Sequence, residues 1–128
     1  MSKTIYVIGP VSGIEDCNRQ AFRDAAEWLT GLGHTVITPF DEPDELAIQE
    51  ALDHGRAARG MPGYQRVMKK MLAHVMSVDE LHALHGWDKS DGARIEVLVA
   101  QTIGTPVFFE DGEPIRLAVD FDAGFGWT

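Results

Sequence analysis

The chain has 128 residues, 45% of them hydrophobic and 24% charged, and its 20 acidic and 11 basic side chains give a formal charge of −9. This length and apolar content predict one globular domain over residues 1–128 and exclude a disordered chain. No uncharged apolar run approaches the roughly 18 residues of a membrane-spanning helix. The acidic balance argues against binding of polymeric nucleic acid, which needs basic side chains at the phosphates, but not against one small phosphate-containing ligand.

The cysteine content limits which disulfides and metal sites are possible, and the N-terminal residues indicate where in the cell the protein is expected. Cys17 is the single cysteine, so an intrachain disulfide is impossible and a zinc site built on several thiolates is excluded. No group of side chains has metal-ligand spacing, and we expect neither a metal nor another cofactor. Because residues 1–9 show no secretory signal, the cytoplasm is the expected location.

The first third of the chain alternates strand and helix signals. A β-branched and aromatic run at 4–8 predicts a strand, which a glycine and a proline end. Apolar residues recur at helical spacing over 21–32, and 36–40 predicts a second strand. A strand, a helix and a strand in this order favour a parallel pair with a right-handed crossover.

The rest of the chain begins with a segment of different character. Residues 41–63 place acidic, proline and glycine flanks around a short predicted helix at about 44–54, and we expect either a lid over the sheet or a solvated excursion. The elements predicted after it are a helix at 64–76, a strand at 81–84, a loop at 86–92, a helix at 95–103, a strand at 107–109 and an edge strand at 115–119. This alternation predicts a small doubly wound, mostly parallel α/β sheet flanked by helices, Rossmann-like or flavodoxin-like, with ligands outside the carboxyl ends of the strands.

Two predicted loops follow strands at that edge and are candidates for a ligand site. The first, 9–13, precedes a helix, so its backbone N–H groups and the Ser12 hydroxyl can hold an anion. Turn glycines are also common for structural reasons, and the loop lacks the dinucleotide-binding and P-loop patterns. The second loop, 86–92, leads into a helix that Ser90 or Asp91 can cap.

Glu96 lies about one turn into that helix. A carboxylate there can simply stabilise the helix dipole, by about 0.3–1 kcal/mol. We expect Ile95, Leu98 and Val99 to form the buried face and Glu96 to lie beside it, so that the carboxylate need not point wholly into solvent. At the rim of a crevice it can act as a nucleophile or a general base.

Several stretches of the chain carry a family resemblance. They are Ile5 to Gly13 (IYVIGPVSG), Gly31 to Val36 (GLGHTV) and Gly86 to Glu96 (GWDKSDGARIE), continued by Ala100 and by Gly104 to Val107. They resemble the nucleoside 2-deoxyribosyltransferase superfamily, which includes deoxyribosyltransferases and 2'-deoxynucleoside 5'-monophosphate N-hydrolases, and especially its small phage and bacterial members. The resemblance spans residues 5–107 and leaves only 41–63 and the tail outside it.

The resemblance implies a nucleophile at Glu96, which attacks the anomeric carbon of a deoxyribosyl group and expels the base. Tyr6 matches a tyrosine that orients this carboxylate, with core packing as the alternative. Ser90 matches a phosphate-binding serine of the monophosphate hydrolases. The implied phosphate cradle is Gly9, Ser12, Gly13, Ser90 and Gly92, and the implied base pocket is Val11, Trp87 and Asp88.

One position departs from the family pattern. The family carries an aspartate, the proton donor to the leaving base, eight residues before the position of Asp79, and this chain has Met71 there. His74 and Asp88 are alternative donors.

The expected function is an N-glycosidase acting on a (deoxy)nucleoside 5'-monophosphate. The alternatives are a nucleotide-binding module with weak or no turnover, and a nucleoside deoxyribosyltransferase. By resemblance we expect a homo-oligomer, with the aromatic tail, 121–128, as a candidate wall of a neighbouring site.

Overall fold

The computed structural model describes residues 2–11, 15–41 and 62–115. Its elements are β1 (Thr4–Ile8), the 3-10 helix η1 (Glu15–Asn18), α1 (Arg19–Gly31), β2 (Thr35–Ile37), the 3-10 helix η2 (Pro39–Asp41), α3 (Pro62–Ser77), β3 (Glu80–Ala83), the 3-10 helix η4 (Trp87–Lys89), α4 (Asp91–Ile103) and β4 (Val107–Phe109). The predicted helix at 44–54 and the aromatic tail lie outside the described residues. No helix within the described ranges is long and apolar enough to cross a bilayer.

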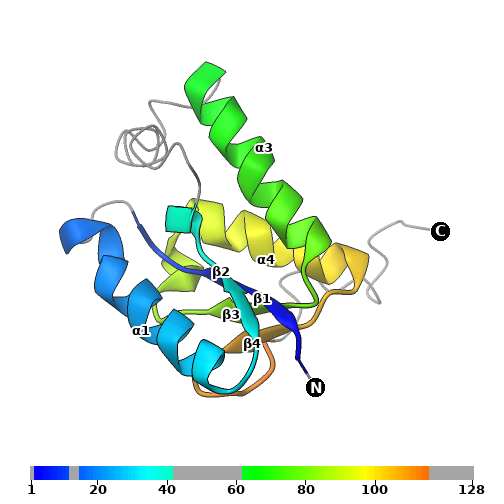
Figure 1. The fold of residues 1–128 in the computed structure, drawn as a ribbon. Coiled ribbons are helices and arrows are strands. Elements are labelled where there is room, and N and C mark those ends of the chain that lie inside the picture. The colour runs from blue at the N-terminus through cyan, green and yellow to red at the C-terminus, as the bar shows by residue number, and fades with distance from the viewer. Residues whose placement is uncertain (1, 12–14, 42–61, 116–128) are drawn as a thin grey trace.

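The strands form one parallel sheet in the order β2-β1-β3-β4. α1 covers one face, and α3 and α4 cover the other (Figure 1). β2 lies on one side of β1 in the sheet, and β3 lies on the other side. The direction in which successive strands are added therefore reverses between β1 and β3. The loop after β1 therefore lies at the topological switch point, where sheets of this kind bind ligands. The predicted α/β fold is confirmed.

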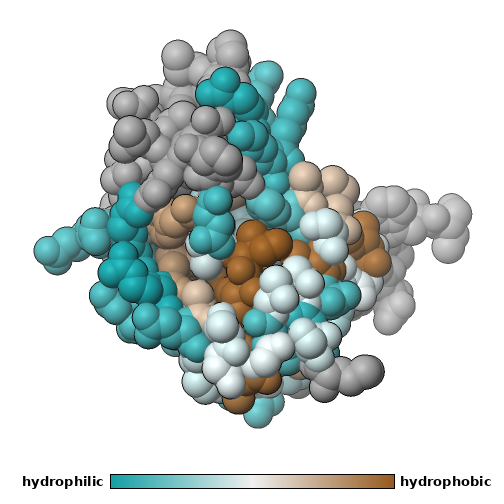
Figure 2. Space-filling model, viewed as in Figure 1, coloured by the Kyte–Doolittle hydropathy of each residue, from teal (hydrophilic) through white to brown (hydrophobic). Residues whose placement is uncertain are grey.

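The core consists of one apolar cluster on each face of the sheet. Alternation along β1 sends Ile5 and Val7 to the α1 face, and Tyr6 and Ile8 to the other. Because β1 is buried on both faces, its sequence is a continuous apolar run rather than an alternating one. In the view of Figure 2, polar side chains predominate over α1 and α3, and apolar side chains reach the surface between them. Trp28 of α1 and Met76 of α3 are exposed apolar exceptions.

The buried face of α4 differs from the prediction. Ile95 is 38% exposed and Leu98 is 36% exposed. The buried residues of this helix are Ala93, Glu96, Val97 and Ala100. Their spacing is that of one helical stripe, and the alanines let the helix approach the sheet closely. Glu96 therefore lies on the buried face itself and not beside it.

The ends of two strands also differ from the predicted bounds. β2 ends at Ile37, because Pro39 begins η2, in which the Asp41 carboxylate accepts a hydrogen bond from the Thr38 backbone N–H at 2.8 Å. The prediction of a strand over 36–40 was therefore wrong in its second half. At the opposite edge, Pro114 forms an isolated antiparallel bridge with Phe108, and 116–119 lies outside the described residues.

Candidate active site

Glu96 is the one buried carboxylate among the described residues, with 7% of its surface exposed. Its oxygen Oε2 is buried and has no hydrogen-bond partner within the described part of the chain. Leaving a buried polar group unpaired costs about 1–3 kcal/mol. Such a group in a folded protein calls for an explanation, and a carboxylate aimed into a reaction site is one.

Burial raises the pKa of Glu96 to about 8, and a hydrogen bond with the Tyr6 side chain acts in the opposite direction. Burial prevails because removing a negative charge from water costs more than one hydrogen bond returns. At pH 7 the neutral acid therefore predominates. A carboxyl group with a pKa displaced this far is typical of a functional position, because it can change its proton state in the range where enzymes operate.

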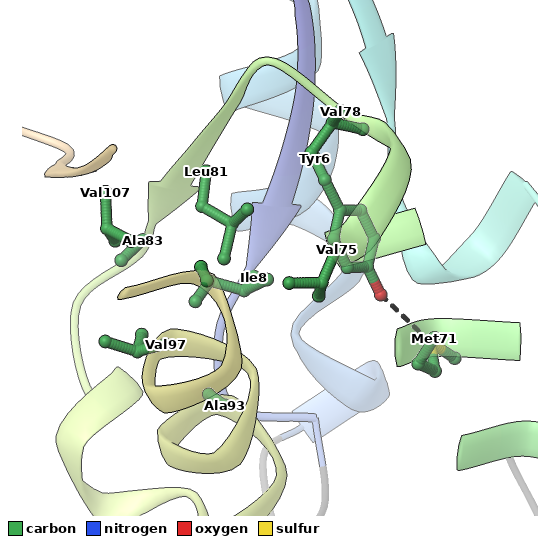
Figure 3. Close-up of a cluster of buried hydrophobic side chains, with 11 residues drawn as sticks. Tyr6, Ile8, Met71, Val75, Val78, Leu81, Ala83, Ala93, Val97 and Val107 are labelled. Atoms are coloured by element: carbon green, nitrogen blue, oxygen red, sulfur yellow. Dashed lines mark hydrogen bonds between the residues drawn. The ribbon is translucent and has the colours of Figure 1, made fainter. Parts of the chain in front are cut away.

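Tyr6 approaches Glu96 from β1. Its side chain is completely buried, and its hydroxyl donates a hydrogen bond to Sδ of Met71 at 2.9 Å (Figure 3). The same side chain hydrogen-bonds with Glu96. The two contacts compete, since a phenol has one proton to donate. A carboxylate is much the stronger acceptor, so we assign the proton to Glu96 whenever Glu96 is ionised. The structure thus brings Tyr6 and Glu96 together.

α3 supplies the next side of the site through residues one helical turn apart. Met71 is buried against Tyr6, and the ring centroid of His74 lies 5.4 Å from that of Tyr6. Of the alternative proton donors considered from the sequence, His74 therefore lies at the Tyr6 end of the site. Asp88 is exposed on η4. The contact between Met71 and Tyr6 was not foreseen, because no local signal links residues 65 positions apart.

The two predicted ligand loops are neighbours, as the sequence suggested. A Cβ on Gly9 would lie 3.0 Å from the Cβ of Leu84, and one on Gly86 would lie 3.2 Å from Cγ of Pro10. Gly86 also has a φ of 85°, a conformation that favours glycine. Both glycines therefore permit close packing of the β1 loop against the β3 loop. Ser12 and Gly13 lie outside the described residues.

Ser90 is the N-cap residue of α4. The Ser90 hydroxyl oxygen accepts a hydrogen bond from the Ala93 backbone N–H at 3.3 Å, and its own proton remains available to donate. A Cβ on Gly92 would meet nothing within 4 Å. Open space at a helix N-terminus suits an anion, while the cap alone also accounts for Ser90.

The three residues expected to line a base pocket lie in different surroundings. Val11 is buried in the cluster on the α1 face. Trp87 is partly buried and packs against the cluster on the α3 and α4 face, and Asp88 is exposed. Trp87 is therefore the member of this set on the same face of the sheet as Glu96.

A separate cavity of about 240 Å³ lies between α1 and the segment of β2 and η2. Arg19 and Arg23 line it, and the Arg19 guanidinium stacks 4.6 Å from the centroid of the Phe40 ring. None of the described residues that line this cavity belongs to the cluster around Tyr6 and Glu96. The buried titratable group lies at Glu96 and not in this cavity, so we place the candidate active site at Glu96. No group of three potential metal ligands occurs within the described residues.

Comparisons with known proteins agree with this fold. Over residues 3–109 the chain matches a family described as "Domain of unknown function (DUF4406)". Among solved structures it is similar to a 2-deoxyribosyltransferase from the psychrotolerant bacterium Bacillus psychrosaccharolyticus, with 19% sequence identity and a TM-score of 0.60 over 98% of this chain and 92% of that chain. At this identity the likeness shows the shared fold. The comparison with curated proteins gave no match.

Proposed function

The chain belongs to the DUF4406 family, and since that family is defined without an activity, we propose a function from the site: cleavage of the base–sugar bond of a (deoxy)nucleoside 5'-monophosphate, with Glu96 as the nucleophile. The observation that carries the proposal is the buried Glu96 carboxyl, which hydrogen-bonds with Tyr6 and has one oxygen without a partner among the described residues. The shared fold with a 2-deoxyribosyltransferase supports glycosyl chemistry at this edge of the sheet.

The proposed reaction proceeds in two displacements. The Glu96 carboxylate attacks the anomeric carbon, the carbon–nitrogen bond breaks, and the base leaves with the electron pair and takes up a proton. Water then attacks the same carbon, its bond to Glu96 breaks, and the proton that the water loses returns to the group that protonated the base. Each step passes through a transition state with positive charge on the sugar, which an adjacent carboxylate stabilises. Burial strengthens this attraction because the local dielectric is low.

The leaving base needs a proton that Met71 cannot provide. His74 is our candidate donor, since its ring lies 5.4 Å from the Tyr6 ring and within one helical turn of Met71. The phosphate of the substrate would lie at the start of α4, where Ser90 has a proton to donate and Gly92 leaves open space.

The test is mass spectrometry for free base after incubation with each common ribo- and deoxynucleoside 5'-monophosphate, at pH 7 and at pH 9. We expect release of base from at least one nucleotide at one of these pH values, because Glu96 must be ionised to attack while the donor to the leaving base must still hold its proton. Glu96→Gln should abolish release, whereas Glu27→Gln, which changes an exposed carboxylate of α1, should not. Failure to release base from every nucleotide at both pH values would contradict the proposal.

Two alternatives have specific support. A nucleoside deoxyribosyltransferase shares the nucleophile, and the similar solved structure is of that kind; exchange of the base after addition of a second free base would identify it. A nucleotide-binding module is favoured by Met71, which cannot donate a proton. That protein would show thermal stabilisation by a nucleotide without any product.

A further inference from the structure

The Tyr6 hydroxyl lies between acceptors on two different helices. It donates to Sδ of Met71 on α3 at 2.9 Å, and the side chain hydrogen-bonds with Glu96 on α4. All three side chains are buried, with exposed fractions of 0%, 4% and 7% for Tyr6, Met71 and Glu96. Figure 3 shows Tyr6 directing its hydroxyl from β1 toward Met71.

The direction of the Tyr6 proton depends on the proton state of Glu96. An ionised carboxylate accepts hydrogen bonds strongly and draws the proton to itself. A neutral carboxylic acid accepts more weakly and has a proton of its own to donate to the tyrosine oxygen. In that state the tyrosine proton turns to the thioether. Rotation about the phenol C–O bond is enough for this exchange, so the backbone need not move.

We propose that Met71 is a positioning residue that stabilises the neutral form of Glu96, by accepting the Tyr6 hydroxyl proton whenever Glu96 is protonated. The inference rests on the proposed function, in which Glu96 is the reacting group. The position that lacks a proton donor thereby acquires a role of its own. An aliphatic side chain at position 71 would remove this acceptor from the neutral state and so favour ionisation of Glu96.

Other titratable groups near the site have to be separated from this effect. Tyr6 of β1 hydrogen-bonds with Glu96, and the ring centroid of His74 on α3 lies 5.4 Å from that of Tyr6. Near the start of α4 lie Asp88, Lys89, Asp91 and Arg94. Burial and the Tyr6 hydrogen bond are the causes that shift the pKa of Glu96, so His74, beside Tyr6, is the neighbour that a control must address.

The test measures the Glu96 pKa directly, by NMR of ¹³C-labelled glutamate carboxyl carbons between pH 5 and pH 10. Glu96→Gln identifies the signal by its loss. Met71→Leu, which nearly conserves volume, should lower the pKa of Glu96 by roughly 0.5–1, the value of one neutral hydrogen bond. Tyr6→Phe should raise it. In the Tyr6→Phe background, Met71→Leu should have no effect, because the proton that Met71 accepts is absent.

Three results would overturn the proposal or separate it from other effects. An unchanged Glu96 pKa in Met71→Leu overturns it. An equal shift in both backgrounds also overturns it, because Met71 would then act through packing. The shift should persist in His74→Gln, and its loss there would assign the effect to the imidazole and overturn the role of Met71. Because the measurement does not use turnover, the expected shifts without base release would contradict the proposed function alone.

A measurement on the unsubstituted protein covers the case in which Met71→Leu does not fold. The methyl ¹³C signal of Met71 should change with pH at the same midpoint as Glu96, since its sulfur gains and loses the Tyr6 proton. This titration should disappear in Glu96→Gln and in Tyr6→Phe. A Met71 methyl signal that does not change with pH between 5 and 10 would overturn the proposal.

Discussion

The side chain of Glu96 combines two properties that rarely occur together: deep burial, and an oxygen with no hydrogen-bond partner in the part of the chain that the structure describes. Neither property follows from its place in the sequence, where a glutamate near a helix start is explained by the helix dipole. The resemblance of the surrounding stretch selected Glu96, and the structure adds a physical reason. A group that burial keeps neutral at pH 7 gains its charge in the range just above.

Substitution at Met71 tests the missing proton donor. Met71→Asp places a second carboxyl group beside Tyr6, where burial and the nearby Glu96 favour its protonated form. If protonation of the leaving base limits turnover, base release should increase, and general acid catalysis is typically worth about 100-fold to 10,000-fold. Met71→Asn is the matched control, because it has the same shape without an acidic proton. Equal rates in both variants would show that another group protonates the base.

At the scale of elements, α4 illustrates what the sequence could and could not predict. Its end before Gly104 was predicted, and Ser90, one of the two predicted cap residues, starts the helix at Asp91, earlier than the predicted range of 95–103. Its buried face was not predicted, because reasoning by side-chain size selected Ile95 and Leu98, while close approach to the sheet required the small residues Ala93 and Ala100. The strand β1 was predictable throughout, since burial on both faces leaves one continuous apolar signal.

The contribution of the Ser90 N-cap to the free energy of unfolding can be measured. Ser90→Ala removes the side-chain acceptor for the Ala93 N–H and should lower the free energy of unfolding by about 1 kcal/mol. Ser77→Ala is the control, because the Ser77 hydroxyl donates to a backbone carbonyl at an exposed helix end. Chemical denaturation of both variants gives the comparison. Similar losses in the two would mean that the Ser90 cap contributes little.

The contact between the β1 and β3 loops can be tested through glycine. Gly9→Ala would place a Cβ 3.0 Å from that of Leu84, so we expect a loss of about 1–3 kcal/mol in the free energy of unfolding. Gly31→Ala, where a Cβ meets nothing within 4 Å, should be neutral or stabilising. If thermal melts show equal effects for the two substitutions, the loops are not held as closely as the structure indicates.

At the scale of the whole molecule, Glu96 makes stability depend on pH. Its pKa rises on folding from the ordinary value of 4.5 to about 8, so the folded protein binds more protons than the unfolded chain between these values. The contribution is therefore fully present below pH 4.5 and is lost as the pH rises through 8, with a slope of at most about 1.4 kcal/mol per pH unit.

Glu96→Gln should remove this dependence and raise the melting temperature at pH 9 relative to the unsubstituted protein, with a smaller difference at pH 5. Calorimetry at both pH values checks this. A variant that is equally destabilised at both would show that Glu96 is not buried as a neutral acid.

His82 should change the pH dependence of stability in the direction opposite to Glu96. Burial lowers the pKa of its imidazole, against the attraction of Glu110 and Glu80, so its contribution to stability is present above the ordinary value of 6.5 and is lost at lower pH. His82→Gln should therefore reduce the acid sensitivity of the protein in urea denaturation at pH 5. An unchanged pH profile would contradict this assignment.

The two edges of the sheet are short. β2 and β4 have three residues each, β2 is followed by Pro39, and β4 is bridged by Pro114. Strands this short offer few free N–H and C=O groups to another chain, and a proline has no N–H to offer. Addition of a foreign strand at either edge is therefore disfavoured, which protects the protein from edge-to-edge aggregation. For copies of this chain that associate, the described helices and loops are therefore better contact surfaces than the two edges of the described sheet.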